Sequence, residues 1–169
     1  MAYQMRVARI NSGAVPAVAG LTTLTGQTFL LGEMVVVNSD GYLTVCGADP
    51  ALIAGVALQG AFSGPGNDMA NSPTVITGQN LSTSVAIANA ATVFLAELTN
   101  SSSTRVAPTQ TDIGGIYGVT AYSGVWTIDK GKTGGSARVQ VVGIAVPPDG
   151  SSVTGVVEFV VIAANRQLA

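Results

Sequence analysis

The strongest constraint on the fold is the alternation of short apolar runs with turn residues. The chain is divided into runs rich in Val, Ile, Leu and Thr, separated by Gly, Pro, Asn, Asp and Ser. Runs of this kind, bounded by turn residues, are typical of the strands of a sandwich or barrel. No stretch predicts a long helix, and neither an internal repeat nor a linker is visible. The 169 residues therefore predict a single all-β domain, a small β-barrel or β-sandwich.

Two hairpins are expected. Asp40-Gly41 separates one pair of apolar runs, and an Asp-Gly turn tolerates the positive φ angles that tight hairpins require. Ser123-Gly124 separates the second pair in the same way. Asp49 to Leu52 predicts one helical turn, with Asp49 as its N-cap and Pro50 at its first position. The expected strands are 34–37, 42–46, 53–61, 74–77, 84–87, 92–98, 116–121, 125–129, 137–145 and 153–163. The last one is expected to be central or covered on both sides, because both of its faces are largely apolar.

Residues 1–12 predict an extended N-terminal arm ahead of one β domain at 13–169. The arm alternates weakly between polar and apolar residues, and it has too little core of its own to fold alone. It is therefore expected to dock on its own domain or on a neighbouring subunit, and the second option predicts an oligomer. Arg6 and Arg9 interrupt any signal-peptide core. The most apolar run, 155–164, contains Glu158 and is shorter than the ~20 residues of a membrane span, so no membrane partner is expected.

The charge content excludes one class of partner and favours another. Seven Lys and Arg and nine Asp and Glu give a net charge of −2, and only 9% of residues are charged, against ~25% in an average domain. So few cations cannot neutralise a phosphate backbone, so no nucleic-acid partner is expected. An uncharged surface suits close contact with other protein, and low net charge promotes association. Assembly is therefore the expected role of the surface.

The residues that would carry chemistry are few. The chain has no His, which removes histidine-based triads and zinc sites. Cys46 is alone and is expected to be buried as a small apolar side chain. Gly131-Lys132-Thr133 lacks the upstream glycine of a phosphate-binding loop. The acids are scattered, although a glycosidase-type carboxylate pair remains geometrically open. No catalytic residue, cofactor or metal is therefore predicted, and the chain is not expected to be an enzyme.

Four segments resemble a known family. GEMVVVNSDGYLTVCGADPALIAGVAL, TDIGGIYGVTAYSGVWTIDK, ARVQVVGIAVPPDG and a last strand ending in NRQLA are similar in character to small capsid decoration (cement) proteins of tailed bacteriophages. The resemblance covers residues 26–169. It implies a β-barrel or β-sandwich, commonly a homotrimer, that binds across junctions of the major capsid protein on the virion surface after synthesis in the bacterial cytoplasm. It carries over no catalytic residue.

The residues expected to serve assembly are those of the arm, one loop and the tail. Trp126 is expected to be a core or inter-subunit anchor, with stacking on a ligand as the lesser option. The competing function is a carbohydrate-binding β-sandwich of a phage tail or cell-surface protein, although aromatic content of 5% is low for a sugar binder. The expected assembly residues are Tyr3, Met5, Arg6, Arg9, Trp126, Arg166 and Leu168, with the loop 63–72.

Overall fold

The computed structural model describes residues 5–10, 17–24, 27, 29–60, 82–101, 104–122, 125–145 and 155–168. Within these ranges the chain forms strands and three short 3-10 turns. The strands are β1 (Arg6–Ile10), β2 (Val18–Thr22), β3 (Met34–Val37), β4 (Leu43–Val45), β5 (Gly55–Ala57), β6 (Ser82–Ile87), β7 (Thr92–Thr99), β8 (Ile116–Tyr122), β9 (Val125–Asp129), β10 (Val139–Ala145) and β11 (Val156–Val161). The turns are η1 (Gln110–Asp112), η2 (Gly134–Ser136) and η3 (Ala163–Asn165). The predicted all-β fold is confirmed.

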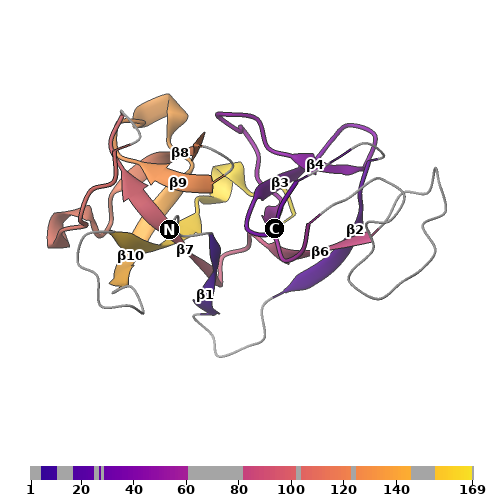
Figure 1. Ribbon diagram of the computed structural model, residues 1–169, viewed down its shortest axis with the longest axis horizontal. Helices are drawn as coiled ribbons and strands as arrows, with labels where there is room; N and C mark the ends of the chain where they lie inside the picture. The colour runs from indigo at the N-terminus through magenta and orange to yellow at the C-terminus, as the bar shows by residue number, and fades with distance from the viewer. Residues whose placement is uncertain are drawn as a thin grey trace.

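The strands form two sheets that lie side by side (Figure 1). The five-stranded sheet has the order β2-β6-β5-β3-β4, and its two edges meet where Thr23 forms a parallel bridge with Leu43. The six-stranded sheet has the order β1-β7-β11-β10-β8-β9, and parallel pairing of β7 with β9 joins five of its strands into a ring. Each sheet is therefore a small barrel. The barrel of β2 to β6 is called the first barrel, and that of β7 to β11 the second barrel.

The described part of the arm belongs to the second barrel's sheet. β1 pairs antiparallel with β7, with Arg6 opposite Leu95 and Val7 opposite Phe94. Met5 and Val7 point into the core, where Met5 is only 2% exposed. Residues 5–10 therefore dock on their own chain, which is the first of the two options that the sequence left open.

The two barrels have the same topology, and this corrects the expectation that the chain contains no repeat. The strand order around the first ring, β2-β6-β5-β3-β4, matches β7-β11-β10-β8-β9 around the second. In each ring four pairings are antiparallel, and the one that closes the ring is parallel. The chain therefore carries one barrel unit twice in tandem, and β1, which precedes both units in the chain, adds to the sheet of the second unit beside β7.

The equivalence extends to individual residue pairs. Gly32 N–H donates to Ala57 O, and Ala57 N–H donates to Glu33 O (both 2.9 Å). Gly114 N–H donates to Val141 O (2.8 Å), and Val141 N–H donates to Gly115 O (2.9 Å), in the same pattern. The pairs of the first barrel and their counterparts in the second are Ala19–Val85 with Phe94–Phe159, Gly55–Ile87 with Val139–Val161, and Thr23–Leu43 with Leu98–Ile128.

Two buried clusters divide the core. The smaller fills the first barrel and consists of Phe29, Val35, Leu43, Ala57, Val85 and Ile87. The larger fills the second barrel around Phe94, Trp126 and Phe159, and it extends to the outer face of the first barrel at Met34, Val56 and Ala86. Burying apolar area stabilises a fold by ~25 cal/mol per Å². The shared cluster therefore makes the two barrels parts of one packed body.

Most of the sequence predictions that fall on described residues are confirmed. β3 and β4 form the hairpin around Gly41, whose φ is +83°, and β8 pairs with β9 as the second hairpin. β11 is central in its sheet, between β7 and β10. The strand expected at 53–61 is shorter, covering only Gly55–Ala57. The strand expected at 74–77 and the loop at 63–72 lie outside the described residues.

The predicted helical turn at Asp49 to Leu52 is wrong. These residues form a bend without helical hydrogen bonding. The carbonyl of Pro50 accepts from Arg138 Nε (2.6 Å), and that of Ala51 accepts from Asn165 Nδ2 (2.6 Å). Contacts with residues far along the chain therefore replace the local bonds that an N-cap and Pro at the first position would favour.

Candidate assembly surface

Of the residues predicted to serve assembly, some lie in the core and others lie on the surface. Trp126 of β9 is 1% exposed and packs in the core of the second barrel, as Met5 does. Both side chains therefore lie inside the chain and away from any surface partner. Arg6 is exposed on β1, and Arg9 lies on the same strand. Tyr3 lies outside the described residues.

The tail of the chain is tied to the first barrel. Arg166 forms a parallel bridge with Ile53, and its Nε donates to Val161 O (2.8 Å). Gln167 makes two bonds with one residue of β3, because its Nε2 donates to Val37 O (2.5 Å) and its Oε1 accepts from Val37 N–H (2.7 Å). Leu168, the next residue, is exposed. Of the predicted tail residues, Leu168 therefore offers a free apolar surface, while Arg166 serves the fold.

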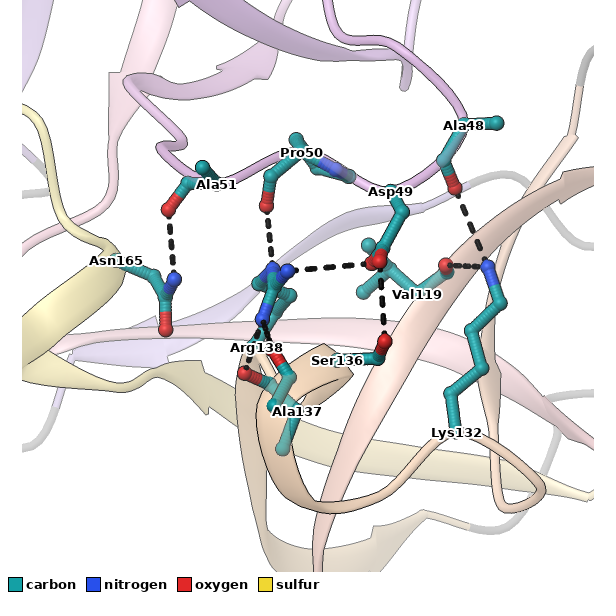
Figure 2. Close-up of polar contacts among 11 residues, drawn as sticks. Ala48, Asp49, Pro50, Ala51, Val119, Lys132, Ser136, Ala137, Arg138 and Asn165 are labelled. Atoms are coloured by element: carbon teal, nitrogen blue, oxygen red, sulfur yellow. Dashed lines mark hydrogen bonds and ion pairs between the residues drawn. The ribbon is translucent and has the colours of Figure 1, made fainter.

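A polar clasp joins the loop after β4 to the loop after β9 (Figure 2). Arg138 lies at its centre, because its Nε donates to Pro50 O and its Nη1 donates to Gly135 O and Ala137 O. Its Nη2 lies 3.5 Å from Asp49 Oδ1. Since Arg138 belongs to the second barrel and Asp49 and Pro50 to the first, the bond to Pro50 and the ion pair with Asp49 join the two barrels, while the bonds to Gly135 and Ala137 hold the guanidinium in its own loop.

Two more side chains complete the clasp. Lys132 Nζ donates to Ala48 O (3.3 Å) across the junction and to Val119 O (2.9 Å) within its own barrel. Ser136 Oγ donates to the second carboxylate oxygen of Asp49 (3.1 Å). In Figure 2 these side chains reach the bend of the first barrel from one loop of the second. Gly131-Lys132-Thr133, the fragment that suggested a phosphate-binding loop, thus supplies a structural lysine.

The buried acids are also held by structural contacts. Asp112 is 1% exposed and forms an ion pair with Lys130 (Oδ1 to Nζ, 2.5 Å). Its Oδ2 accepts from Thr109 N–H (2.7 Å) and Thr109 Oγ1 (3.0 Å), and its Oδ1 accepts from the Tyr117 hydroxyl (3.3 Å). Burial alone would raise the pKa of Asp112, but the bonds from Lys130 and Thr109 and the charge of Lys130 outweigh it and lower the pKa.

Three more titratable side chains, those of Tyr117, Glu97 and Cys46, are partly or fully buried. Burial, and then the charge of Asp112, raise the pKa of the Tyr117 hydroxyl. Glu97, which is 1% exposed, lies 2.7 Å from Arg105 Nε. Cys46 is buried as expected, and burial raises the pKa of its thiol to about 12, so it is held as the unreactive thiol. Among the described residues no group of three His, Cys, Asp or Glu is placed to hold a metal ion.

Ten large apolar side chains are exposed among the described residues. Two of them, Leu31 and Ile113, lie at equivalent type II turns of the two barrels, each followed by a glycine with φ of +86°. A hydrogen bond closes each turn, since Glu33 N–H donates to Leu30 O and Gly115 N–H donates to Asp112 O. The exposed large apolar residues are Val18, Leu30, Leu31, Val45, Leu52, Leu58, Ile113, Ile116, Ile144 and Leu168.

Sequence reasoning missed most of this surface. It selected the arm and the tail, whereas Leu31 and Ile113 lie at turns where polar residues are the usual choice. The signal was present, because Leu30-Leu31-Gly32 and Asp112-Ile113-Gly114 each place apolar residues directly before a turn glycine.

The comparisons with known proteins name no relative: no family model, no curated protein and no solved structure matches the chain. In the described part of the chain there is no helix with the length and apolar character that crossing a bilayer requires. The function is therefore inferred from the residues and their geometry.

Proposed function

We propose that this protein is a structural protein of a phage virion that decorates and stabilises the capsid by binding across junctions of the major capsid protein. The observation that carries the proposal is the set of ten large apolar side chains exposed on the described part of a double barrel with few charges. A protein that holds two shell subunits together needs a stiff, neutral and complementary surface, because buried apolar area supplies the affinity. The resemblance to capsid decoration proteins supports the same role.

The placement of the cations also favours a protein partner. The Lys and Arg side chains of the second barrel and the tail bind carboxylates or carbonyl oxygens of the same chain, which leaves them poorly suited to a phosphate backbone. These residues are Arg105, Lys130, Lys132, Arg138 and Arg166. Burial of Trp126 weighs against the competing carbohydrate-binding role, since a sugar stacks only on an exposed aromatic face. Homo-oligomerisation, with a trimer favoured, belongs to the proposal because several linked copies bind a repetitive shell more tightly.

The direct test mixes the purified protein with undecorated shells of the virus that encodes it. We expect saturable binding at a fixed ratio to the major capsid protein, and greater resistance of the decorated shells to heat. Replacing both turn residues, Leu31→Lys with Ile113→Lys, should weaken binding, whereas Thr111→Lys, an exposed polar neighbour, serves as the matched control. Absence of saturable binding would overturn the proposal.

A further inference from the structure

The two barrels differ in how one equivalent face is covered. In the first barrel, Met34, Val56 and Ala86 point away from the barrel interior, because the residues next to them in each strand, Val35, Ala57 and Val85, fill it. Met34 pairs with Val56 and Val56 pairs with Ala86, so the three side chains form a row across the outer face. All three are at most 1% exposed, and they belong to the cluster that fills the second barrel. The second barrel therefore buries this face together with the neighbouring residues Cys46, Ile53 and Ala88 of the same cluster.

The same row exists in the second barrel. Ile116 pairs with Gln140, and Gln140 pairs with Val160. Ile116 follows the turn glycine Gly114 by two residues, as Met34 follows Gly32, so Ile116, Gln140 and Val160 are the register counterparts of Met34, Val56 and Ala86. Here the row is open: Ile116 is 45% exposed, and Gln140 and Val160 are half-buried.

This asymmetry defines the kind of contact that joins the barrels. An isologous contact buries the same face on both partners, whereas a heterologous contact buries it on one partner and leaves it open on the other. The barrels of this chain follow the second pattern. A heterologous contact between like units continues into further copies until it closes as a ring or extends as a chain. The open face of the second barrel is therefore the position at which the pattern continues.

The chemistry of the open face suits such a contact. Half-buried Ile162 lies two residues beyond Val160 on the same face and extends the row, whose members carry no charge. The charged residues Glu158 and Arg138, two residues before Val160 and Gln140, border the row. The Gln140 amide donates to Gly114 O (3.3 Å), so its polar group is already bonded within the chain. Because the row itself is uncharged and its one polar group is already hydrogen-bonded, burying it under a partner costs little desolvation free energy.

We propose that the outer face of the second barrel defined by Ile116, Gln140 and Val160 binds a second copy of this chain. The occupant follows from the structure, since the equivalent face of the first barrel is covered by a barrel unit of the same topology. The inference deepens the self-association part of the proposed function by naming its surface. It does not depend on binding to a shell.

Sedimentation equilibrium of the full chain in the absence of shells tests the inference. We expect the wild-type chain to form oligomers, and Ile116→Lys with Val160→Lys to weaken self-association on the order of 100-fold or more, because two ammonium groups would have to be buried. Leu31→Lys is the matched control, since Leu31 is 49% exposed but lies on a turn of the first barrel. The control should assemble like the wild type.

A readout without substitution guards against a variant that fails to fold. Hydroxyl-radical footprinting of the wild-type chain should show less oxidation of Ile116 and Val160 in the oligomer than in the diluted monomer, with Leu31 unchanged. A wild-type chain that stays monomeric at high concentration, or equal footprints in both states, overturns the inference. Oligomers that assemble through this face yet fail to bind shells would overturn the proposed function and leave this inference standing.

Discussion

At the scale of single residues, Asp112 shows how a buried charge is made compatible with a barrel core. Its carboxylate receives bonds from Thr109 and Tyr117 and an ion pair from Lys130. Asp112→Asn removes the charge and turns one acceptor oxygen into a donor, which leaves neighbouring donors unpaired. We expect a loss of about 1–3 kcal/mol in the free energy of unfolding, measured by urea denaturation. Asp40→Asn, at an exposed turn, should stay close to the wild type, and an equal loss in both variants would contradict the account.

The same carboxylate predicts a direction for the pH dependence. Because the pKa of Asp112 is lower in the folded chain than its ordinary value of 3.8, the unfolded chain binds the proton more readily. The stabilisation from Asp112 is therefore complete above pH ~4, and it is lost as the pH falls through the folded pKa. Urea midpoints measured between neutral and acidic pH should fall more for the wild type than for Asp112→Asn. Parallel curves for the two proteins would refute this assignment.

The positive φ angle of Gly114 allows the turn geometry of the second barrel to be tested by substitution. Its φ is +86°, and a Cβ placed on it meets no atom within 4 Å, so any cost of a side chain is conformational. Gly114→Ala should destabilise the chain by about 1 kcal/mol, measured by thermal unfolding. Gly47→Ala is the matched control, because Gly47 is equally open but has no positive φ. The control should be neutral or slightly stabilising, and a loss at Gly47 as large as at Gly114 would count against the turn geometry.

At the scale of elements, the clasp around Arg138 holds the two barrels together. Arg138→Ala removes three bonds to carbonyl oxygens, and we expect a loss of about 2 kcal/mol in unfolding free energy. Asp49→Asn removes an exposed ion pair and disturbs the exposed bond from Ser136, and it should cost about 0.5 kcal/mol or less. Chemical denaturation of both variants and of the double variant separates the two contributions. A loss at Asp49 as large as at Arg138 would show that the ion pair, and not the carbonyl bonds, supports the clasp.

Elements with local determinants were predictable from the sequence. The hairpin of β3 and β4 follows from Asp40-Gly41, and the alternation of Val139 and Val141 with Gln140 gave β10 its inner and outer faces. The bend at Asp49 to Leu52 was not predictable, because the groups that bind its carbonyls lie 88 and 114 residues away in Arg138 and Asn165. Helix-capping preferences consider only bonds between neighbouring residues. Here the side chains of Arg138 and Asn165, far along the chain, bind the carbonyls instead.

At the scale of the whole molecule, the repeat escaped the sequence because the two interiors are filled differently. Ala19 and Val85 face each other in the first barrel, whereas Phe94 and Phe159, with ring centroids 5.6 Å apart, occupy the equivalent positions in the second. Apolar residues of different size can fill the interiors of two barrels with the same topology, so equivalent positions need not look alike in the sequence. Of the predicted assembly residues, Met5 and Trp126 lie in the core, whereas Ile116, which the sequence did not single out, is exposed.

The shared core predicts that the two barrels unfold together. Met34, Val56 and Ala86 of the first barrel belong to the buried cluster that fills the second, so unfolding one barrel would expose apolar surface of the other. Fluorescence of Trp126 reports the second barrel alone, whereas far-ultraviolet circular dichroism reports the strands of both. We expect the two signals to change at the same denaturant concentration, as two-state unfolding requires. Separate midpoints would show that the barrels fold independently, and the covered face would then contribute little to stability.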